Sequence, residues 1–274
     1  MVRTSMIMDL NVGSKLATAM VSIMGLLIST WSVTMATDGA GCGDPESFLR
    51  YRKIEPSTVP YSEPLVSTTK ATFGMGCFWG VEASFGALPG VVRVKAGYTG
   101  GKLDNPNYRI LGDHTEAVEI EFNPTKTSYG ALLKVFHQDH DPTELYKPQY
   151  MSAIFYHDDV QRHHAEASLQ AEQKRRGGEG SQIVTQILPA EKFYPAEDYH
   201  QKYFLRQQHA LVESLHLKDA DFLSSSRASR LLGYMSGPGT VEGFNAEVES
   251  LALSTSQADF MRVLIENKDG GTCH

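Results

Sequence analysis

The sequence is poor in cysteine and has little clustered positive charge. Its 274 residues include three cysteines, Cys42, Cys77 and Cys273. Such a sparse, odd number does not fit a small scaffold held by disulfides, so a hydrophobic core must stabilise the fold. The net charge is −7 and the one basic cluster is Lys174-Arg175-Arg176, so nothing indicates a nucleic-acid partner. The composition is that of an ordinary globular protein, with one large domain or one domain with appendages.

One run near the N-terminus is apolar and lacks charge. Leu16–Ala36 follows the basic Lys15 and ends in small residues. This pattern is typical of a signal peptide cleaved after Ala36, which predicts residues 1–36 as a signal peptide and places the mature protein in the secretory pathway or outside the cell. If the segment is not cleaved, about 20 apolar residues are long enough to anchor the chain in a membrane.

The rest of the chain divides into three parts. Residues 37–66 lack periodicity and predict an extended lead-in. Residues 67–218 alternate strand and helix patterns and predict a domain of the α/β (α+β) class, a mixed sheet with packed helices. Residues 219–274 form a C-terminal extension that carries Cys273 and predicts either a docking pair of helices or a partly disordered tail. The predicted strands are 68–73, 91–96, 116–122, 152–156 and 182–188, and the predicted helices are 81–85, 128–137, 158–176 and 199–217.

The central motif is Phe73–Gly80, in which Cys77 stands before two aromatics and between glycines. A strand precedes it and a helix follows, so Cys77 is expected at a helix N-terminus. Unpaired backbone N–H groups there favour an anion such as a thiolate, the reactive form of cysteine. Phe78 and Trp79 are expected to line an apolar pocket beside the sulfur. The alternative is an inert cysteine in an aromatic core.

A second candidate is Glu116, which begins the strictly alternating strand of residues 116–122. A thiol that attacks a substrate needs an acid nearby to protonate the group that leaves. Burial beside an apolar pocket would raise the pKa of Glu116 and keep it protonated. The alternative is a strand glutamate that faces solvent, as expected for Glu119 and Glu121.

The octapeptide resembles the signature of the A-class peptide methionine (S)-sulfoxide reductases, the MsrA family, and the predicted signal makes the chain similar to a secretory-pathway member. Further motifs match in family order over residues 68 to 206. They are Gly97-Tyr98-Thr99-Gly100-Gly101, Asn105-Pro106-Asn107-Tyr108, His114-Thr115-Glu116, His140-Asp141-Pro142-Thr143, Gln149-Tyr150-Met151-Ser152 and Tyr199-His200-Gln201. Several spaced motifs in order are more specific than any one of them.

The resemblance implies a two-layer, ferredoxin-like plait and an oxidoreductase that returns methionine S-sulfoxide, free or in oxidised proteins, to methionine. It implies Cys77 as the nucleophile and Glu116 as the proton donor. Tyr108 and Tyr150 would hold the sulfoxide oxygen, while Phe78 and Trp79 would receive the methyl group. It implies no bound cofactor and no metal, and the oligomeric state expected is a monomer.

Recycling of the oxidised thiol needs a second reductant. Cys273 lies in a glycine-rich end and, by the resemblance, resolves Cys77 as a disulfide that thioredoxin or another dithiol then reduces. The alternative is a structural bridge between Cys42 and Cys273. Cys42 is otherwise a second resolving thiol or free.

The chain departs from the family between His140-Asp141-Pro142-Thr143 and Gln149. The family carries Gly-Asn-Asp there, whereas this chain has the shorter Glu144-Leu145-Tyr146-Lys147-Pro148, so the family aspartate has no counterpart. A sulfoxide-peptide-binding protein with weak or lost catalysis is therefore an alternative. A thiol peroxidase is another. A disulfide oxidoreductase is less favoured, because the chain has no Cys-x-x-Cys pair.

His137, His140 and Asp141 have a spacing that metal ligands can use, but the sequence offers no fourth ligand. Surface histidines at a helix end are the favoured interpretation.

Overall fold

The computed structural model describes residues 53–177 and 182–268. The described residues all belong to one compact unit. The predicted signal peptide over 1–36, Cys42 and Cys273 all lie outside the described residues. Within the described ranges, no helix is both long and apolar enough to cross a membrane.

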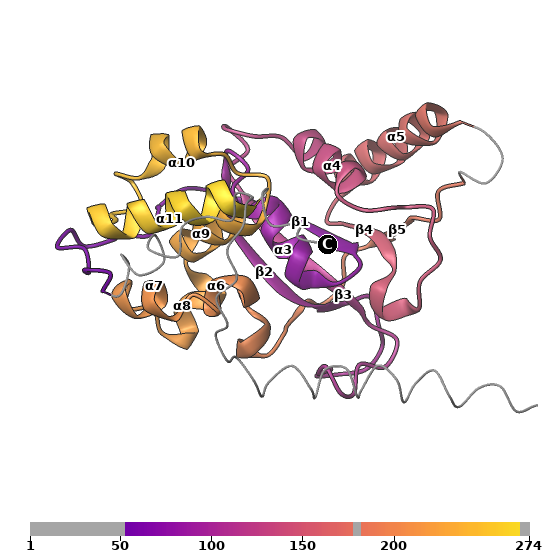
Figure 1. Cartoon of the computed structure of the whole chain (residues 1–274). Coiled ribbons are helices and arrows are strands. Elements are labelled where there is room, and N and C mark those ends of the chain that lie inside the picture. Colours follow the sequence, from indigo (N-terminus) through magenta and orange to yellow (C-terminus); the bar gives the residue numbers. More distant parts are fainter. Residues whose placement is uncertain (1–52, 178–181, 269–274) are drawn as a thin grey trace, which may run out of the picture. The chain divides into compact units, whose positions relative to one another are not determined.

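A six-stranded sheet organises the described chain, in the order β5-β4-β1-β3-β2-β6 (Figure 1). The pair β4–β5 is parallel, and the other neighbours are antiparallel. Helices pack on this sheet, which confirms the α/β class with a mixed sheet. The strands are β1 (Thr69–Met75), β2 (Val91–Thr99), β3 (Thr115–Phe122), β4 (Ser152–Tyr156), β5 (Gln186–Pro189) and β6 (Tyr194–Pro195).

Alternate side chains of β3 face the hydrophobic core and the opposite face of the sheet. Val118 pairs with Phe73 of β1, and both side chains are buried in the main core. Glu119 points to the opposite face and pairs with Lys95 at 2.7 Å. Side chains two residues apart share a face, so Glu116 lies on the face of Val118, with the core and the helices. The alternative of a solvent-facing Glu116 is therefore excluded, and the expectation that Glu119 faces solvent is wrong as well, because Glu119 is only 4% exposed.

Three helices complete this region: α3 (Phe78–Gly86), α4 (Tyr129–Gln138) and α5 (Asp159–Arg176). The Ser128 hydroxyl accepts from the N–H of Ala131 at 3.2 Å, and Asp158 caps α5 in the same way. Side-chain oxygens at these positions satisfy N–H groups that the helix leaves unpaired. The sequence-based helices over 128–137 and 158–176 are confirmed to within one residue at each end.

The predicted helix over 199–217 is wrong, because the chain forms three short pieces. They are the 3-10 turn η2 (Asp198–His200), α6 (Tyr203–Arg206) and α7 (His209–Ser214). Between η2 and α6, Lys202 has a left-handed φ of 52°. The backbone N–H and the Nζ of Lys202 both donate to the fully buried Glu82 of α3, at 2.7 and 2.6 Å. This tertiary ion pair interrupts a locally favourable helix.

Strand boundaries also differ from expectation. The predicted strand over 182–188 begins only at Gln186, and β2 continues through the glycine-containing segment to Thr99 because Gly97–Thr99 pair with β3. The two-residue strand β6 pairs with Gly97 and Tyr98. A strand of two residues has no periodicity for sequence analysis to detect.

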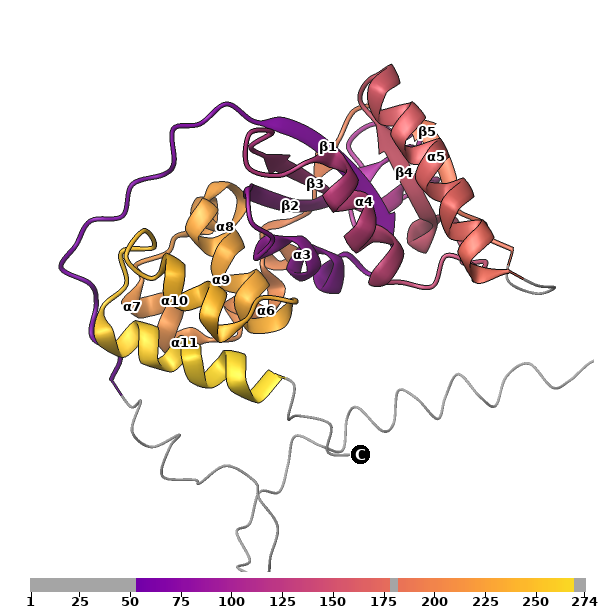
Figure 2. The same cartoon turned by 90° about the horizontal axis from the view of Figure 1, so that it is seen from above.

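The C-terminal extension is helical as far as the structure describes it, so the expectation of partial disorder is wrong for residues 219–268. It contains α8 (Asp219–Ser224), α9 (Ser226–Ser236), α10 (Val241–Glu247) and α11 (Thr255–Lys268). Leu231, Phe244 and Met261 form a second core that also includes Ala83 and Ala87. Figure 2 shows α3 between the sheet and these orange-to-yellow helices.

The contact between α3 and α9 is close at glycines. A Cβ on Gly86 would lie 2.3 Å from the carbonyl oxygen of Ser229, and one on Gly233 would lie 1.9 Å from the nitrogen of Ala87. Arg230 of α9, 5% exposed, donates to the carbonyls that end α3, those of Gly86, Ala87 and Leu88, at 2.7 to 3.0 Å. The C-terminal helices are thus joined to the helix that follows Cys77.

Candidate functional site

Cys77 lies where sequence analysis placed it, between a strand and a helix. β1 ends at Met75, Gly76 turns the chain with a left-handed φ of 88°, and Cys77 is the N-cap of α3. A β-carbon on Gly76 would strain this turn, because L side chains rarely adopt that conformation. The thiol is free and exposed. The alternative of a cysteine buried in an aromatic core is excluded.

The electrostatics of Cys77 differ from expectation. Partial desolvation raises the pKa of the thiol, and the nearby Glu116 carboxylate raises it further. Backbone N–H groups of Trp79 and Gly80 lower the pKa, as expected at a helix N-terminus. The net direction is upward, so the expectation that the helix end alone favours a thiolate is wrong. At neutral pH the free site holds mainly a thiol.

Glu116 lies directly beside the start of α3. Its Oε2 accepts from the backbone N–H of Phe78 at 3.1 Å, and its Oε1 accepts from Nε2 of Gln149 at 2.8 Å. The residue is 1% exposed, and desolvation raises the pKa of its carboxyl group despite both hydrogen bonds. Burial therefore favours the neutral acid, as expected from sequence.

The two phenols come from separate loops. Tyr150 ends the 3-10 turn η1 (Pro148–Tyr150), and Tyr108 lies in a tight turn whose Asn107 and Ile110 pair with one another. Desolvation, the Glu116 carboxylate and a hydrogen bond with the Tyr108 side chain raise the pKa of Tyr150. The structure thus brings both predicted tyrosines together, on the side of Glu116 and Cys77.

The aromatic pair after Cys77 packs inward. Phe78 is 1% exposed, and its ring centroid is 5.0 Å from that of His200. Trp79 is half-buried, stacks on Tyr203 at 3.7 Å and donates its Nε1–H to Nδ1 of His200 at 3.0 Å. Of the two aromatics predicted to line a pocket beside the sulfur, Phe78 is almost fully buried and only Trp79 retains an exposed part.

An open cleft of about 350 Å³ adjoins the sulfur instead, and we call it the Cys77 cleft. His140 on its wall binds the carbonyl of Phe136 through Nδ1 at 2.6 Å and the Ser152 hydroxyl through Nε2 at 2.7 Å. Burial lowers the pKa of His140, which favours the neutral ring. The lining residues are Met75, Gly76, Cys77, His140, Asp141, Tyr146, Tyr150 and Ser152.

The histidines noted in the sequence do not form a metal centre. His137 contacts the Ser168 hydroxyl at 3.1 Å, whereas His140 turns toward Ser152. Residues 53–177 and 182–268 contain no group of three or more His, Cys, Asp or Glu side chains that could hold a metal ion. Both histidines are partly buried and hydrogen-bonded, so their assignment as surface histidines is wrong.

The shortened loop over 144–148 contributes Tyr146 to the cleft, while its Glu144 is exposed. The carboxylate that lines the cleft is Asp141, from the preceding motif. Its Oδ1 accepts from the N–H and the hydroxyl of Thr143 at 3.0 and 2.8 Å, and these bonds lower its pKa. A carboxylate is thus present in the cleft although the family aspartate is missing.

Sequence reasoning gave no role to three residues that shape this site. Gln149 holds Glu116, His200 holds Trp79, and Glu197 accepts from both the Tyr98 hydroxyl at 2.8 Å and the Tyr108 N–H at 2.9 Å. Gln149 and His200 belong to the quoted motifs, so their position in those motifs was the available signal. Nothing in the local pattern distinguished Glu197 from a surface glutamate.

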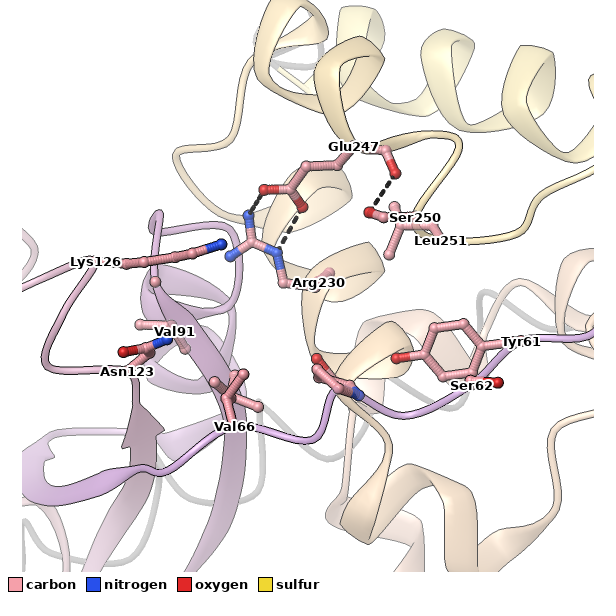
Figure 3. Close-up of a pocket in the computed structure, with 14 residues that line it drawn as sticks. Tyr61, Ser62, Val66, Val91, Asn123, Lys126, Arg230, Glu247, Ser250 and Leu251 are labelled. Atoms are coloured by element: carbon pink, nitrogen blue, oxygen red, sulfur yellow. Dashed lines mark hydrogen bonds and ion pairs between the residues drawn. The ribbon is translucent and has the colours of Figure 1, made fainter.

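A second large cavity, of about 390 Å³, lies between the lead-in, the sheet and the C-terminal helices. Figure 3 shows the paired Arg230 and Glu247 on one wall and Lys126 and Tyr61 on others. Its lining residues include no cysteine or histidine. The predicted nucleophile Cys77 therefore lines the Cys77 cleft and not this second cavity.

Two family models match the chain. The model described as peptide methionine sulfoxide reductase matches residues 69–230, which include the sheet, Cys77 and Glu116. The model described as the helical domain of selenoprotein methionine sulfoxide reductase A matches residues 216–266. The second match spans α8 to α11, so the helical extension is itself a known accompaniment of the first domain.

Relatives with similar sequences carry the same description. A peptide methionine sulfoxide reductase of Drosophila melanogaster is 42% identical over 226 residues, covering 82% of this chain and 91% of the relative. The peptide methionine sulfoxide reductase MsrA of Methanococcoides burtonii is 48% identical over 151 residues, which is 51% of this chain and 97% of that protein.

Among solved structures, methionine sulfoxide reductase A of Corynebacterium diphtheriae is similar, with a TM-score of 0.50 and 31% identity. The match covers 57% of this chain and 83% of that one. Its fold agrees with the mixed sheet and packed helices described above. Taken with the geometry around Cys77 and Glu116, these matches show that the chain belongs to the MsrA family of peptide methionine sulfoxide reductases, which are oxidoreductases.

Proposed function

We propose that the chain reduces methionine S-sulfoxide, free or in oxidised proteins, through the thiol of Cys77. The observation that carries this proposal is the backbone N–H of Phe78, which follows Cys77 directly and binds the Glu116 carboxyl at 3.1 Å. One short segment thus holds a nucleophile next to a buried acid. Attack of the Cys77 sulfur on the sulfoxide sulfur transfers the oxygen, so methionine leaves and Cys77 becomes a sulfenic acid.

Glu116 is proposed as the proton donor. Its raised pKa favours the neutral form that can protonate the sulfoxide oxygen as the S–O bond weakens. The Cys77 thiol gives its proton to the Glu116 carboxylate, which restores the neutral acid. The phenols of Tyr108 and Tyr150 are proposed to donate to the same oxygen, because their side chains already meet one another near Glu116.

The methyl group is proposed to contact Trp79. This ring keeps an exposed part and is fixed by His200 and Tyr203. Phe78 is nearly fully buried and packs against the His200 ring, which in turn binds Trp79. A rigid aromatic surface next to the sulfur suits an apolar substituent on the sulfoxide.

Recycling is proposed to use Cys273 as the resolving thiol. Its sulfur displaces the hydroxyl of the Cys77 sulfenic acid, which forms a Cys77–Cys273 disulfide and water. Thioredoxin or another dithiol then reduces the disulfide to two thiols. Cys42 is the competing resolving thiol, and a Cys42–Cys273 bridge would remove Cys273 from the cycle.

The alternative of a binding protein without catalysis, which rested on the missing family aspartate, is not supported by the relatives reported above, which are named as reductases. The exposed thiol of Cys77, the buried carboxyl group of Glu116 and the Asp141 carboxylate in the cleft support catalysis instead.

We further propose that residues 1–36 direct the chain to the secretory pathway, where it repairs oxidised proteins as a monomer. N-terminal sequencing of the secreted chain and its elution volume would test the cleavage and the oligomeric state.

The test is a single-turnover reaction of the purified chain with an S-sulfoxide peptide and no added reductant. We expect about one methionine per chain, and mass spectrometry should then detect the Cys77–Cys273 disulfide. Methionine formed together with a Cys77 sulfenic acid would keep the reductase chemistry but remove Cys273 from it. Bound peptide with no methionine formed would support the binding protein.

The matched control is Cys77→Ser. The side chain is exposed at an N-cap position, where serine is favourable, so the fold should be retained. Methionine formation should fall to background while thermal unfolding stays unchanged. Residual turnover by this variant would show that another group reduces the sulfoxide.

A further inference from the structure

Exposed apolar side chains gather on the loops around the Cys77 cleft. Among the described residues, ten large apolar or aromatic side chains are exposed. Five of these ten lie on three segments beside the site: Tyr108, Ile110, Leu145, Tyr146 and Tyr199. Scattered exposed apolar residues need no explanation, but a contiguous group beside a binding cleft marks an interaction surface.

The first group, the loop ridge, consists of Leu145 and Tyr146. Tyr146 lines the cleft and is 51% exposed, and its neighbour Leu145 is 86% exposed. Both stand in the shortened loop between the His140 motif and η1. A leucine that is 86% exposed contributes nothing to the hydrophobic core, so Leu145 is free to contact another molecule.

The second group, the turn ridge, consists of Tyr108, Ile110 and Tyr199. Asn107 fixes the turn, since its Oδ1 accepts from the Ile110 N–H at 2.9 Å, and Glu197 accepts from the Tyr108 N–H. The rings of Tyr108 and Tyr199 lie 4.9 and 4.1 Å from the ring of His200. The turn ridge is therefore held rigidly although it is exposed.

The two ridges are continuous with the cleft. Tyr146 and Tyr150 both line it, and the Tyr150 side chain lies close to that of Tyr108 in the turn ridge. A molecule whose sulfoxide reaches Cys77 thus lies next to residues of both ridges. The cleft of about 350 Å³ has room for one side chain, so atoms beyond that side chain must lie over the ridges.

We propose that the two ridges bind apolar side chains that flank the oxidised methionine, so that the enzyme selects extended polypeptide segments with apolar neighbours. This inference rests on the proposed function, and it deepens it by assigning specificity to Leu145 and Ile110. Apolar flanking residues are buried in folded proteins, so the surface favours unfolded segments. Burial of a leucine side chain against such a ridge raises affinity by removing apolar area from water.

The test compares two peptides with one central methionine S-sulfoxide, flanked either by leucines or by glycines. We expect kcat/KM about tenfold higher for the leucine-flanked peptide, the factor expected when about half of a leucine side chain is buried. Equal values for the two peptides, with turnover of both, would overturn this inference alone. Turnover of neither peptide by the wild-type chain would instead overturn the proposed function.

Variants locate the effect. In Leu145→Ser and Ile110→Ser, the ratio of the two kcat/KM values should fall toward one, mainly through a higher KM for the leucine-flanked peptide. The glycine-flanked peptide serves as the reference within each variant. Leu65→Ser is the matched control, because Leu65 is fully exposed on the lead-in, and it should keep the tenfold ratio.

A reductant protein is the competing occupant of this surface. If the substitutions at Leu145 and Ile110 leave the peptide ratio at ten but raise the KM for thioredoxin, the ridges bind the reductant and the inference is wrong. If the ratio falls and the KM for thioredoxin is unchanged, the assignment to the substrate holds.

Discussion

The two ends of α3 are built in opposite ways. The N-terminal end carries an exposed Cys77 and the open Gly80, where a Cβ would meet nothing within 4 Å. The C-terminal end is closed by Arg230, whose guanidinium covers the last carbonyls, and by Gly86, where a Cβ would strike the backbone of α9. One helix thus has one end left free for chemistry and the other immobilised by packing.

This difference shows how a reactive group is kept both accessible and fixed. An exposed nucleophile cannot be held by neighbours that cover it, so its position must come from the element that carries it. Two contacts supply that rigidity. Glu82 in the middle of α3 forms a buried ion pair with Lys202, and Arg230 binds the carbonyls at the end of α3. Precise placement from rigid elements is what catalytic geometry requires.

The largest effect should follow from breaking the closed end. Arg230→Met removes the donor to three carbonyls and leaves Glu247, whose side chain is 32% exposed, without its partner. We expect the free energy of unfolding in urea to fall by about 3 kcal/mol, because the substitution leaves buried carbonyl oxygens at the end of α3 without their donor.

Arg262→Met is the control for this substitution. Arg262 pairs with Asp259 at 2.6 Å, but the side chains are 34% and 49% exposed, so the loss should stay within about 1 kcal/mol. Equal losses for the two variants would show that Arg230 does not clamp α3.

The next effect tests the open end. Glu116→Gln keeps the shape of the side chain but removes the acid, so kcat should fall by about 10²–10³-fold. Steady-state assays with excess dithiothreitol measure this without the recycling step. Glu121→Gln changes a glutamate on the other face of β3 and should alter kcat less than about twofold. A similar small change in Glu116→Gln would assign proton donation to another group.

A matched pair of glycine substitutions sharpens the comparison within α3. Gly86→Ala forces a Cβ toward the Ser229 carbonyl and should cost about 1–3 kcal/mol of unfolding free energy. Gly80→Ala meets open space and should gain up to about 1 kcal/mol, because alanine favours helix. Urea unfolding of both variants checks the signs. A loss in Gly80→Ala equal to that in Gly86→Ala would show that the open end is packed.

The smallest effect concerns the pKa of the thiol. Once the pH is high enough for Glu116 to ionise, its carboxylate beside Cys77 disfavours a second negative charge, so it raises the thiol pKa. Glu116→Gln removes that charge and should lower the pKa of Cys77. The rate of alkylation by iodoacetamide between pH 6 and 10 follows the thiolate, so its midpoint should move to lower pH. An unchanged midpoint would mean that desolvation alone raises the pKa.

The sequence was sufficient for patterns that are local. The alternation of β3, the helices over 128–137 and 158–176 and the strand–turn–helix at Cys77 all follow from nearest neighbours, and the structure confirms each. The helix over 199–217 failed because Lys202 binds Glu82, 120 residues away. Local helix propensity is worth little against a buried charged pair that must be satisfied.

For this protein, the sequence by itself determined the class of fold and the placement of Cys77 and Glu116 at adjoining elements, because motif spacing and strand alternation are local patterns. Only the tertiary structure decided the protonation of the site and its access. Desolvation and the neighbouring carboxylate outweigh the helix end at Cys77, and His200 draws Trp79 inward. Both effects arise from groups that are far apart in the sequence, so a local sequence pattern cannot predict that they lie close together in space.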